Sequence, residues 1–552
     1  MREDTEQQTV IIQLTPPIEP QLEPQRSSSR WMRYFITDDV SPDNALIIEL
    51  QRRACWIGLA MIFQAINEIP PFIYLPVLPF LAPWIGLISF SLITGSFFAL
   101  WMAFRPATLK LQNTIALTIA QRVIWTAFRS LNLKSRQTKT IPAQKDPRHW
   151  QRVIVVLLLI TSLAGAAELV SSVVMDFFMT PIYRNDGTSL DTNAAALLLE
   201  GRDPYLDSSI LSVVRRFPIL PDWTTPLREG QLADSIIYPT SWELRSILDT
   251  DLKAGSAPEF ESKVSYPALS FLTLLPFIWL HTNNVLPLYL LCYFLIIFVG
   301  WKKLRPEMRP WLILVAMANA SMWTSVMNGS VDILYILLIL LAWLLRDARW
   351  WSAIFLGLAL ATKQLAWFFV PFYAILTWRR YGLREAMRRL SIAGGIMLAI
   401  NLPFILWNPQ AWIMGVLAPV VDPMFPLGVG LVALSSTPVL PILPAVVYTT
   451  LEALAMLFCL AWYWRICKSH PEAAMLLAVL PLFFAWRSLS SYFCCSALPL
   501  FILQVARVLP KRDDQSRRAR LPIWNVQDIR AEASNFPAPV GARAALQTLR
   551  FF

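Results

Sequence analysis

Long apolar segments that are almost free of charge recur along most of this chain and limit what it can fold into. Residues 311–327 and 331–345, for example, contain one charged side chain between them. Segments of about 17–25 such residues cross a bilayer as helices. Hydrophobic residues make up 56% of the chain and charged residues 15%, whereas soluble domains have about 45–50% and about 25%. We therefore predict an all-α polytopic membrane protein, and not a soluble enzyme, a nucleic-acid-binding domain or a secreted disulfide scaffold.

Cysteine, histidine and charge patterns narrow the chemistry. The six cysteines lie in or beside apolar runs and none falls in the one long polar segment, so no disulfide framework is indicated. Three histidines without CxxC or HExxH spacing argue against a zinc site. The net charge of +11 comes from short basic segments beside apolar runs, as the positive-inside rule predicts. The charge therefore reports membrane topology, and we expect no nucleic-acid partner.

The chain divides into four parts. Residues 1–53 form a cytoplasmic N-terminal segment, disordered in composition at its start and too polar for a signal peptide. Residues 54–151 contain a membrane hairpin (spans 54–69 and 84–104), then a basic cytoplasmic segment that includes an amphipathic stretch at 109–131. Residues 152–508 form the main membrane module, and 509–552 form a basic cytoplasmic tail.

The main module begins with a span at 152–175. Further spans are predicted at 285–300, 311–327, 331–345, 351–362, 364–378, 391–407, 442–464, 472–486 and 489–508. We expect a re-entrant or broken helix at 266–280, because a full crossing would place the basic run 301–309 outside. The result is a helical bundle of about 10–13 transmembrane helices in the cell (cytoplasmic) membrane, with both termini cytoplasmic.

One long polar segment, 178–265, follows the first span of the main module and is expected on the extracytoplasmic side. It carries thirteen acidic residues against eight basic ones, and a loop of this length is long enough to fold. Asp186 and Asp191 precede a helix-forming run at 194–199, and a turn between them would let both reach one pocket. Near a membrane, a carboxylate can acquire the pKa of a general base. The alternatives are a site for a divalent cation and a simple helix cap.

Two basic residues outside this segment and one acidic motif within it are further candidates for functional residues. Lys363 lies between two short apolar runs, where a charge indicates a functional site; the alternative is a snorkelling lysine. Arg487 lies between two predicted spans and is a second candidate; the alternative is an arginine at the membrane interface. The Asp249-Thr250-Asp251 motif imitates the DxD of nucleotide-sugar enzymes, but no βαβ pattern surrounds it, so we interpret it as a loop.

Several short motifs follow one another in a recognisable order. After the acidic pair, a predicted helix ends in the apolar and Gly-Arg-Asp-Pro-Tyr pattern of Leu197–Tyr205. Five further elements follow: Tyr266–Ala268, Asn328–Asp332, Gly357–Lys363, Asn401–Phe404 and Trp407–Trp412. Their order resembles the polyprenyl-phosphate-mannose-dependent mannosyltransferase-like group of bacterial GT-C integral-membrane glycosyltransferases, over about residues 150–500. The sequence departs from that pattern at Ala268, where the group has a second proline, and at Ser330, where it has glutamine.

The resemblance implies a GT-C-like fold and an inverting glycosyltransferase that uses a polyprenyl-phosphate sugar, mannose above others, at the outer face of the membrane. The acceptor would be a glycan, lipid or protein. Asp186 would be the catalytic base, and Asp191 would orient the acceptor or hold a cation such as Mg²⁺ or Mn²⁺. The implied substrate-binding residues are Tyr205, Tyr266, Asn328, Lys363 and Arg487, the last two for the leaving phosphate.

Two other functions remain as alternatives. A transporter or flippase of a lipid-linked substrate would have charged residues inside its spans and internal repeats, and this sequence has neither in a convincing form. A non-catalytic scaffold of the same fold is the other alternative. The asymmetric, acid-rich first loop favours an enzyme over a transporter, and substitution of Asp186 distinguishes all three, because a transporter or a scaffold should tolerate asparagine there.

Overall fold

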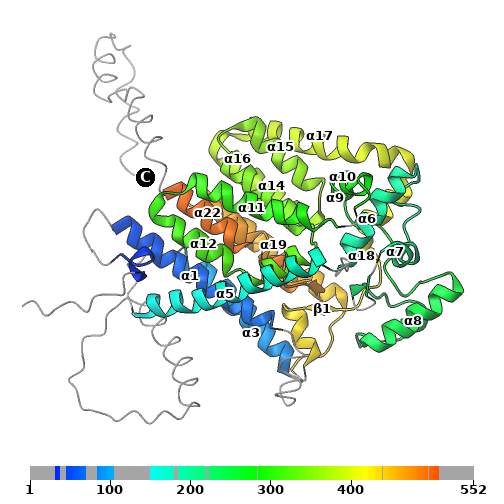
Figure 1. Cartoon of the computed structure of the whole chain (residues 1–552). Helices are drawn as coiled ribbons and strands as arrows, with labels where there is room; N and C mark the ends of the chain where they lie inside the picture. The colour runs from blue at the N-terminus through cyan, green and yellow to red at the C-terminus, as the bar shows by residue number, and fades with distance from the viewer. Residues whose placement is uncertain are drawn as a thin grey trace, which may run out of the picture.

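The computed structural model describes residues 31–37, 45–69, 84–104, 149–178, 185–217, 219–220, 223–235, 237–282, 284–437, 439–494 and 496–508 (Figure 1). Within these residues, regular structure is helical except for two short strands, β1 (Leu427–Gly428) and β2 (Arg487–Ser488), which pair in parallel. The all-α prediction is confirmed. The expected tails and the amphipathic stretch at 109–131 lie outside the described residues.

The helices follow one another in a single order along the chain. The α-helices are α1 (Ala45–Asn67), α3 (Ile85–Met102), α5 (His149–Phe178), α6 (Asp186–Leu199), α7 (Ile210–Arg216), α8 (Ser241–Ala254), α9 (Leu269–Leu272), α10 (Leu275–Trp279), α11 (Leu286–Lys303), α12 (Arg309–Met317), α13 (Ala320–Met327), α14 (Asp332–Leu344), α15 (Arg349–Leu360), α16 (Val370–Tyr381), α17 (Leu383–Trp407), α18 (Pro409–Val421), α19 (Ala445–Ile466), α20 (Ala474–Leu477), α21 (Ser491–Cys494) and α22 (Ala497–Val508). Short 3-10 helices are η1 (Met32–Tyr34), η5 (Gly230–Leu232), η6 (Pro306–Met308), η7 (Gln364–Phe369), η8 (Leu431–Ser436), η9 (Pro471–Ala473) and η10 (Leu480–Phe484).

Five helices in the described part of the chain are long and apolar enough to cross a membrane, namely α3, α5, α11, α17 and α19. A sixth crossing results if η6–α12 and α13, which meet at a 57° bend, count as one span. The five are long apolar helices at the positions of the spans predicted at 84–104, 152–175, 285–300, 391–407 and 442–464. The predicted span 54–69 lies in α1, which is not among the five, and other apolar helices have only 10–17 residues. The total number of crossings therefore stays a prediction.

Several predicted elements are broken or displaced. The stretch 266–280 forms two short helices, α9 and α10, which confirms the broken helix expected there. The predicted span 472–486 is not one helix but the series η9, α20 and η10. The Asp249-Thr250-Asp251 motif lies inside α8, so its interpretation as a loop was wrong; an Asp-Thr-Asp run is compatible with a helix whose Thr240 and Glu243 form a capping box.

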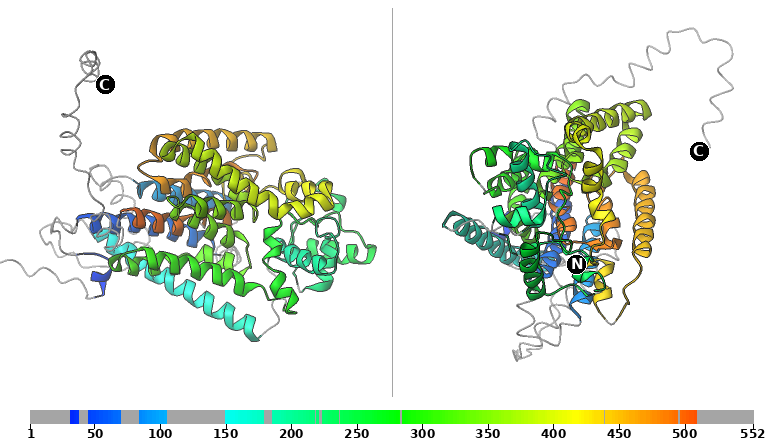
Figure 2. Two further views of the ribbon diagram at one scale, coloured as in Figure 1. Left: turned by 90° about the horizontal axis from the view of Figure 1, so that it is seen from above. Right: turned by 90° about the vertical axis from the view of Figure 1, so that its right-hand side faces the viewer.

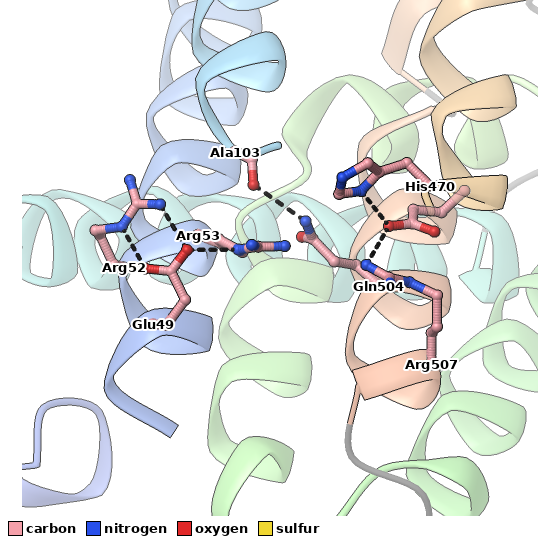
Figure 3. Close-up of polar contacts among 8 residues, drawn as sticks. Glu49, Arg52, Arg53, Ala103, His470, Gln504 and Arg507 are labelled. Atoms are coloured by element: carbon pink, nitrogen blue, oxygen red, sulfur yellow. Dashed lines mark hydrogen bonds and ion pairs between the residues drawn. The ribbon is translucent and has the colours of Figure 1, made fainter. Parts of the chain in front are cut away.

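The N-terminal hairpin packs into the bundle through α1 and α3. A buried hydrogen bond of 2.9 Å joins Gln64 Nε2 of α1 to Ser96 Oγ of α3. At the other end of α3, Gln504 Nε2 of α22 donates to the Ala103 carbonyl over 3.0 Å (Figure 3). A β-carbon on Gly58 would come within 2.3 Å of Leu158 in α5, so this glycine permits a close approach of the two helices. The hairpin is therefore held by both polar and apolar contacts.

Residues 185–265, together with the turn 422–424, form a folded unit that we call the polar cap. It lies at one end of the helical bundle in two perpendicular views (Figures 1 and 2). Leu227 N donates to Glu259 O, and Arg228 N donates to Pro423 O, both over 2.8 Å. Lys263 Nζ pairs with Asp422 at 2.6 Å. The expectation that the long polar segment is folded is confirmed.

Candidate active site

The N-terminus of α6 forms the centre of the candidate site. Asn185 is the N-cap, and its side chain accepts a hydrogen bond from Gly187 N over 2.8 Å. Asp186 is the first helical residue and is partly exposed; its Oδ1 accepts from the same amide, also at 2.8 Å. A carboxylate is stabilised at this end of a helix by the backbone dipole. Asn185 therefore performs the capping role that was the alternative for Asp186 and Asp191.

Two motif segments pack against the first turn of α6. A β-carbon on Gly187 would lie 2.9 Å from the Tyr266 hydroxyl oxygen, so the tyrosine ring closely approaches the α6 backbone. Thr188 Oγ1 donates to the carbonyl of Gly329, a residue with φ of +74°, a conformation that favours glycine. Asn328 precedes this turn and is partly exposed. The structure thus brings the Tyr266 and Asn328 segments to Asp186.

Asp191 is in a different environment from Asp186, although both belong to α6. Asp191 is 1% exposed, and its Oδ1 accepts a 3.0 Å hydrogen bond from Ser270. Within the described part of the chain, its Oδ2 has no hydrogen-bond partner. Burial raises the pKa of Asp191 from 3.8 to about 8, although Ser270 and Lys363 lower it. The expected turn between the two aspartates is a helix instead, and positions five residues apart point to different sides of it.

Lys363 lies in a buried ion pair on the other side of Tyr266. Its Nζ is 2.6 Å from Asp332 Oδ1 and 4.8 Å from the centroid of the Tyr266 ring. Ser330 Oγ donates to Asp332 Oδ2 over 2.7 Å. Lys363 is only 7% exposed, so the snorkelling alternative is wrong. Its charge is balanced by Asp332, as a buried ammonium group requires.

Arg487 lies in β2, which pairs with Leu427 of β1. Its side chain is half-buried, and within the described residues no carboxylate pairs with it. The buried Tyr492 is within electrostatic range of both Arg487 and Lys363. Among the described residues, Arg487 therefore has no carboxylate partner, and it shares Tyr492 with Lys363 as an electrostatic neighbour.

Tyr205 is buried and contacts the backbone of the Tyr266 segment. Its hydroxyl donates to the backbone carbonyl of Tyr266 over 2.8 Å, and its ring packs edge-on against Phe271 and Phe404. Asn401 Oδ1 accepts from Ala268 N over 2.9 Å. These contacts hold the backbone of the Tyr266–Ala268 motif from the side opposite α6. We therefore assign Tyr205 a supporting position and not a substrate-facing one.

Three residues of this cluster were not predicted as site residues: Ser270, Asp332 and Tyr492. Asp332 carried a usable signal, because it is the only charged residue in the apolar run 331–345 and such a residue usually has a partner. Ser270 and Tyr492 carried none, because a lone hydroxyl in an apolar segment is common. The long-range contact between Asp332 and Lys363 appears only in the folded chain.

The side chains present do not form a metal site by themselves. Within the described residues, no three His, Cys, Asp or Glu side chains are close enough to hold an ion. Asp191, the residue proposed to hold Mg²⁺ or Mn²⁺, is buried and favours its neutral form. A hard cation prefers several ionised oxygen ligands, so Asp191 does not fit this role.

Comparisons with known proteins agree with this geometry. Residues 265–486 match the model of glycosyltransferase family 87; this region contains Tyr266, Asn328 and Lys363 but not α6. A Dol-P-Man:Man(5)GlcNAc(2)-PP-Dol alpha-1,3-mannosyltransferase from Homo sapiens is 34% identical over 79 residues, or 14% of this chain and 18% of the relative. The chain thus spans less than a fifth of that relative's length in the match, and no solved structure matches. Both comparisons confirm the resemblance that the motifs indicated: this chain is related to glycosyltransferases, and its residues 265–486 match family 87.

Proposed function

We propose that this protein is an inverting membrane glycosyltransferase that takes a sugar from a polyprenyl-phosphate donor. The observation that carries the proposal is the cluster in which Asp186 of α6 meets Tyr266, Asn328 and Lys363 from three separate segments. The family match supports glycosyl transfer. The relative's name, a Dol-P-Man mannosyltransferase, supports mannose and a lipid-phosphate donor.

In the proposed reaction, Asp186 acts as the general base. Its carboxylate takes the proton from an acceptor hydroxyl, the hydroxyl oxygen bonds to the anomeric carbon, and the bond from that carbon to the phosphate oxygen breaks. The polyprenyl phosphate leaves with the electron pair. Because the hydroxyl oxygen attacks the face of the anomeric carbon opposite the phosphate, the anomeric configuration inverts. Partial exposure leaves Asp186 accessible to an acceptor, whereas Asp191 is buried and out of an acceptor's reach. Asp191 instead fixes α6 against Ser270.

Arg487 is the proposed ligand of the leaving phosphate. A guanidinium without a carboxylate partner can engage two phosphate oxygens and stabilise the charge that develops in the transition state. Lys363 is less suited to this role, since Asp332 neutralises it at 2.6 Å. We assign Lys363 to positioning Tyr266, over whose ring its ammonium group lies. Asn328 and Tyr266 would contact the sugar.

The proposal includes the orientation of the molecule. The polar cap and the site would face the extracytoplasmic side of the cell membrane, and both termini would be cytoplasmic, as the basic segments predict. A transporter or flippase would not need a partly exposed carboxylate beside a family 87 motif segment. A scaffold would tolerate the loss of that carboxylate.

The donor class is tested with the full chain reconstituted in phosphatidylethanolamine/phosphatidylglycerol vesicles. Polyprenyl-phosphate-mannose is supplied in the membrane and GDP-mannose is supplied as the nucleotide-sugar control. Release of polyprenyl phosphate from the first and of GDP from the second is measured by mass spectrometry. We expect turnover of the lipid donor alone. Turnover of GDP-mannose alone would refute the lipid donor, and movement of intact donor across the bilayer without release would support the flippase.

A further inference from the structure

An apolar groove lies on the outside of the bundle, far from the candidate active site. It has a volume of about 680 Å³ and is lined mainly by α5 and α12, within the ~300–1,000 Å³ of pockets that hold small molecules. Leu163 of α5 is 72% exposed and Ile313 of α12 is 38% exposed. Since α5 runs along the edge of the bundle (Figure 2) and is a candidate membrane span, the groove faces lipid.

The floor of the groove is built by a close approach of the two helices. Ser162 Oγ of α5 donates to the Leu314 carbonyl of α12 over 3.1 Å. A β-carbon on Gly165 would come within 2.6 Å of the Met317 carbonyl oxygen. Because these contacts fix the helices, the groove is a built feature that extends along about 12 Å of α12, at 1.5 Å per residue.

The groove is basic at the end where α12 begins. Arg309, the first residue of α12, lines the groove, and its guanidinium lies 4.9 Å from the Trp301 ring centroid. The preceding segment adds Lys302, Lys303 and Arg305 against a single acid, Glu307. The buried Nε of Arg309 has no hydrogen-bond partner among the described residues. An anion at this position would pair with the guanidinium and with the positive end of the helix dipole.

We propose that this groove binds an anionic phospholipid of the bilayer, with the phosphate at Arg309 and one acyl chain between α5 and α12. The ligand is recognised by two features, an arginine that binds the phosphate and an apolar, lipid-facing groove that holds the acyl chain. Phe35, the residue after η1, closes the groove beside the headgroup position. It is held by a 2.8 Å hydrogen bond from Trp311 Nε1 to its carbonyl. Basic pockets between membrane helices suit such headgroups.

The test measures lipid retention by native mass spectrometry of the purified full chain, titrated with 1-palmitoyl-2-oleoyl-phosphatidylglycerol or the corresponding phosphatidylcholine. Two variants attack the site: Arg309→Gln removes the phosphate ligand, and Ala166→Trp fills the groove. Two variants are matched controls. Arg388→Gln removes another arginine stacked on a tryptophan, at 5.0 Å from Trp350, and Ala167→Trp adds the same bulk at the next, exposed position of α5.

We expect about tenfold weaker phosphatidylglycerol binding for Arg309→Gln and Ala166→Trp, the size of a lost charge-assisted contact, and unchanged binding for both controls. Arg309→Gln carries the test alone if Ala166→Trp fails to fold. The proposal is overturned if Arg309→Gln binds as wild type, if Arg388→Gln loses as much, or if phosphatidylcholine is retained equally. Displacement by equimolar polyprenyl phosphate would assign the groove to the donor lipid instead.

Discussion

Asp186 and Asp191 occupy the same helix, yet their surroundings give them opposite chemistry. Asp186 is partly exposed and accepts a hydrogen bond from a backbone amide, whereas Asp191 is buried and accepts a hydrogen bond from a serine hydroxyl. Only Asp186 is accessible to a substrate, and burial raises the pKa of Asp191 to about 8, so we propose different roles for the two carboxyl groups. Replacement by asparagine conserves the shape of the side chain at both positions, but its effect on donor turnover should differ between them.

Asp191→Asn should keep donor turnover within about tenfold of wild type, because asparagine is a close neutral mimic of a protonated aspartate and can still accept from Ser270. Initial rates in the vesicle assay check this. A loss of about 10² or more, the size expected for a general base, would contradict the supporting role and transfer the base to Asp191.

Asp191 also makes a pH prediction. Because burial raises its pKa from 3.8 to about 8, the folded state holds a proton there that the unfolded state releases above pH 3.8. The contribution of Asp191 to stability therefore falls as pH rises from about 4 to about 8. Melting midpoints of wild type and Asp191→Asn in one detergent should diverge over this window, in favour of the variant. A constant difference across the window would refute the neutral carboxyl.

The ion pair between Asp332 and Lys363 makes a prediction about stability. Lys363→Met or Asp332→Asn alone leaves one buried charge unpaired, which should cost about 3–5 kcal/mol of unfolding free energy. The double variant should lose much less than the sum. Denaturation of the four proteins under one condition gives the coupling energy; losses that add within about 0.5 kcal/mol would show that the two charges are independent.

At the scale of elements, the N-terminal hairpin supports the segment that carries Arg487. Phe97 of α3 lies 5.6 Å from Phe483 and 5.2 Å from Phe493, measured between ring centroids. These two phenylalanines precede and follow Arg487 in the chain. A hairpin that lies outside the motif resemblance thus contacts both ends of the proposed phosphate-binding segment.

Phe97→Leu should loosen that segment and raise the KM for the lipid donor by about threefold to tenfold, since an aromatic pair contributes about 0.5–1.5 kcal/mol beyond its area. The matched control is Phe98→Leu, at a 37% exposed position that contacts Trp101. Steady-state kinetics in vesicles separate KM from kcat. Equal KM values for the two variants would mean that the hairpin does not position Arg487.

Helices were predicted correctly where an uninterrupted apolar run sets their length. They were predicted wrongly where a break in the backbone divides the run. The helices α5, α11, α17 and α19 follow from their uninterrupted apolar runs. The run 311–327 is equally apolar but bends at Asn319, whose side chain caps α13, and Pro409 begins the unpredicted α18 directly after α17. Such a cap depends on the local backbone conformation and does not change the hydropathy of the run, so the apolar pattern could not predict it.

At the scale of the whole molecule, the candidate site joins segments that lie far apart in the chain. Their shared importance was inferred from the order of motifs that resemble a family, because periodicity within one segment cannot reveal contacts between Asp186, Tyr266 and Lys363. The burial of Asp191 and the neutralisation of Lys363 by Asp332 depend on tertiary packing. Those two facts are the basis on which we propose Asp186, not Asp191, as the base and Arg487, not Lys363, as the phosphate ligand.

The central claim is that the carboxylate of Asp186 removes the acceptor proton. The most direct measurement is polyprenyl-phosphate-mannose turnover in one vesicle preparation by wild type, Asp186→Asn and Asp207→Asn. Asp207 is the matched control, a partly exposed aspartate that pairs with Arg202 at 3.1 Å. We predict a loss of about 10² or more for Asp186→Asn and wild-type turnover for Asp207→Asn. Turnover by Asp186→Asn equal to that of wild type would contradict the account.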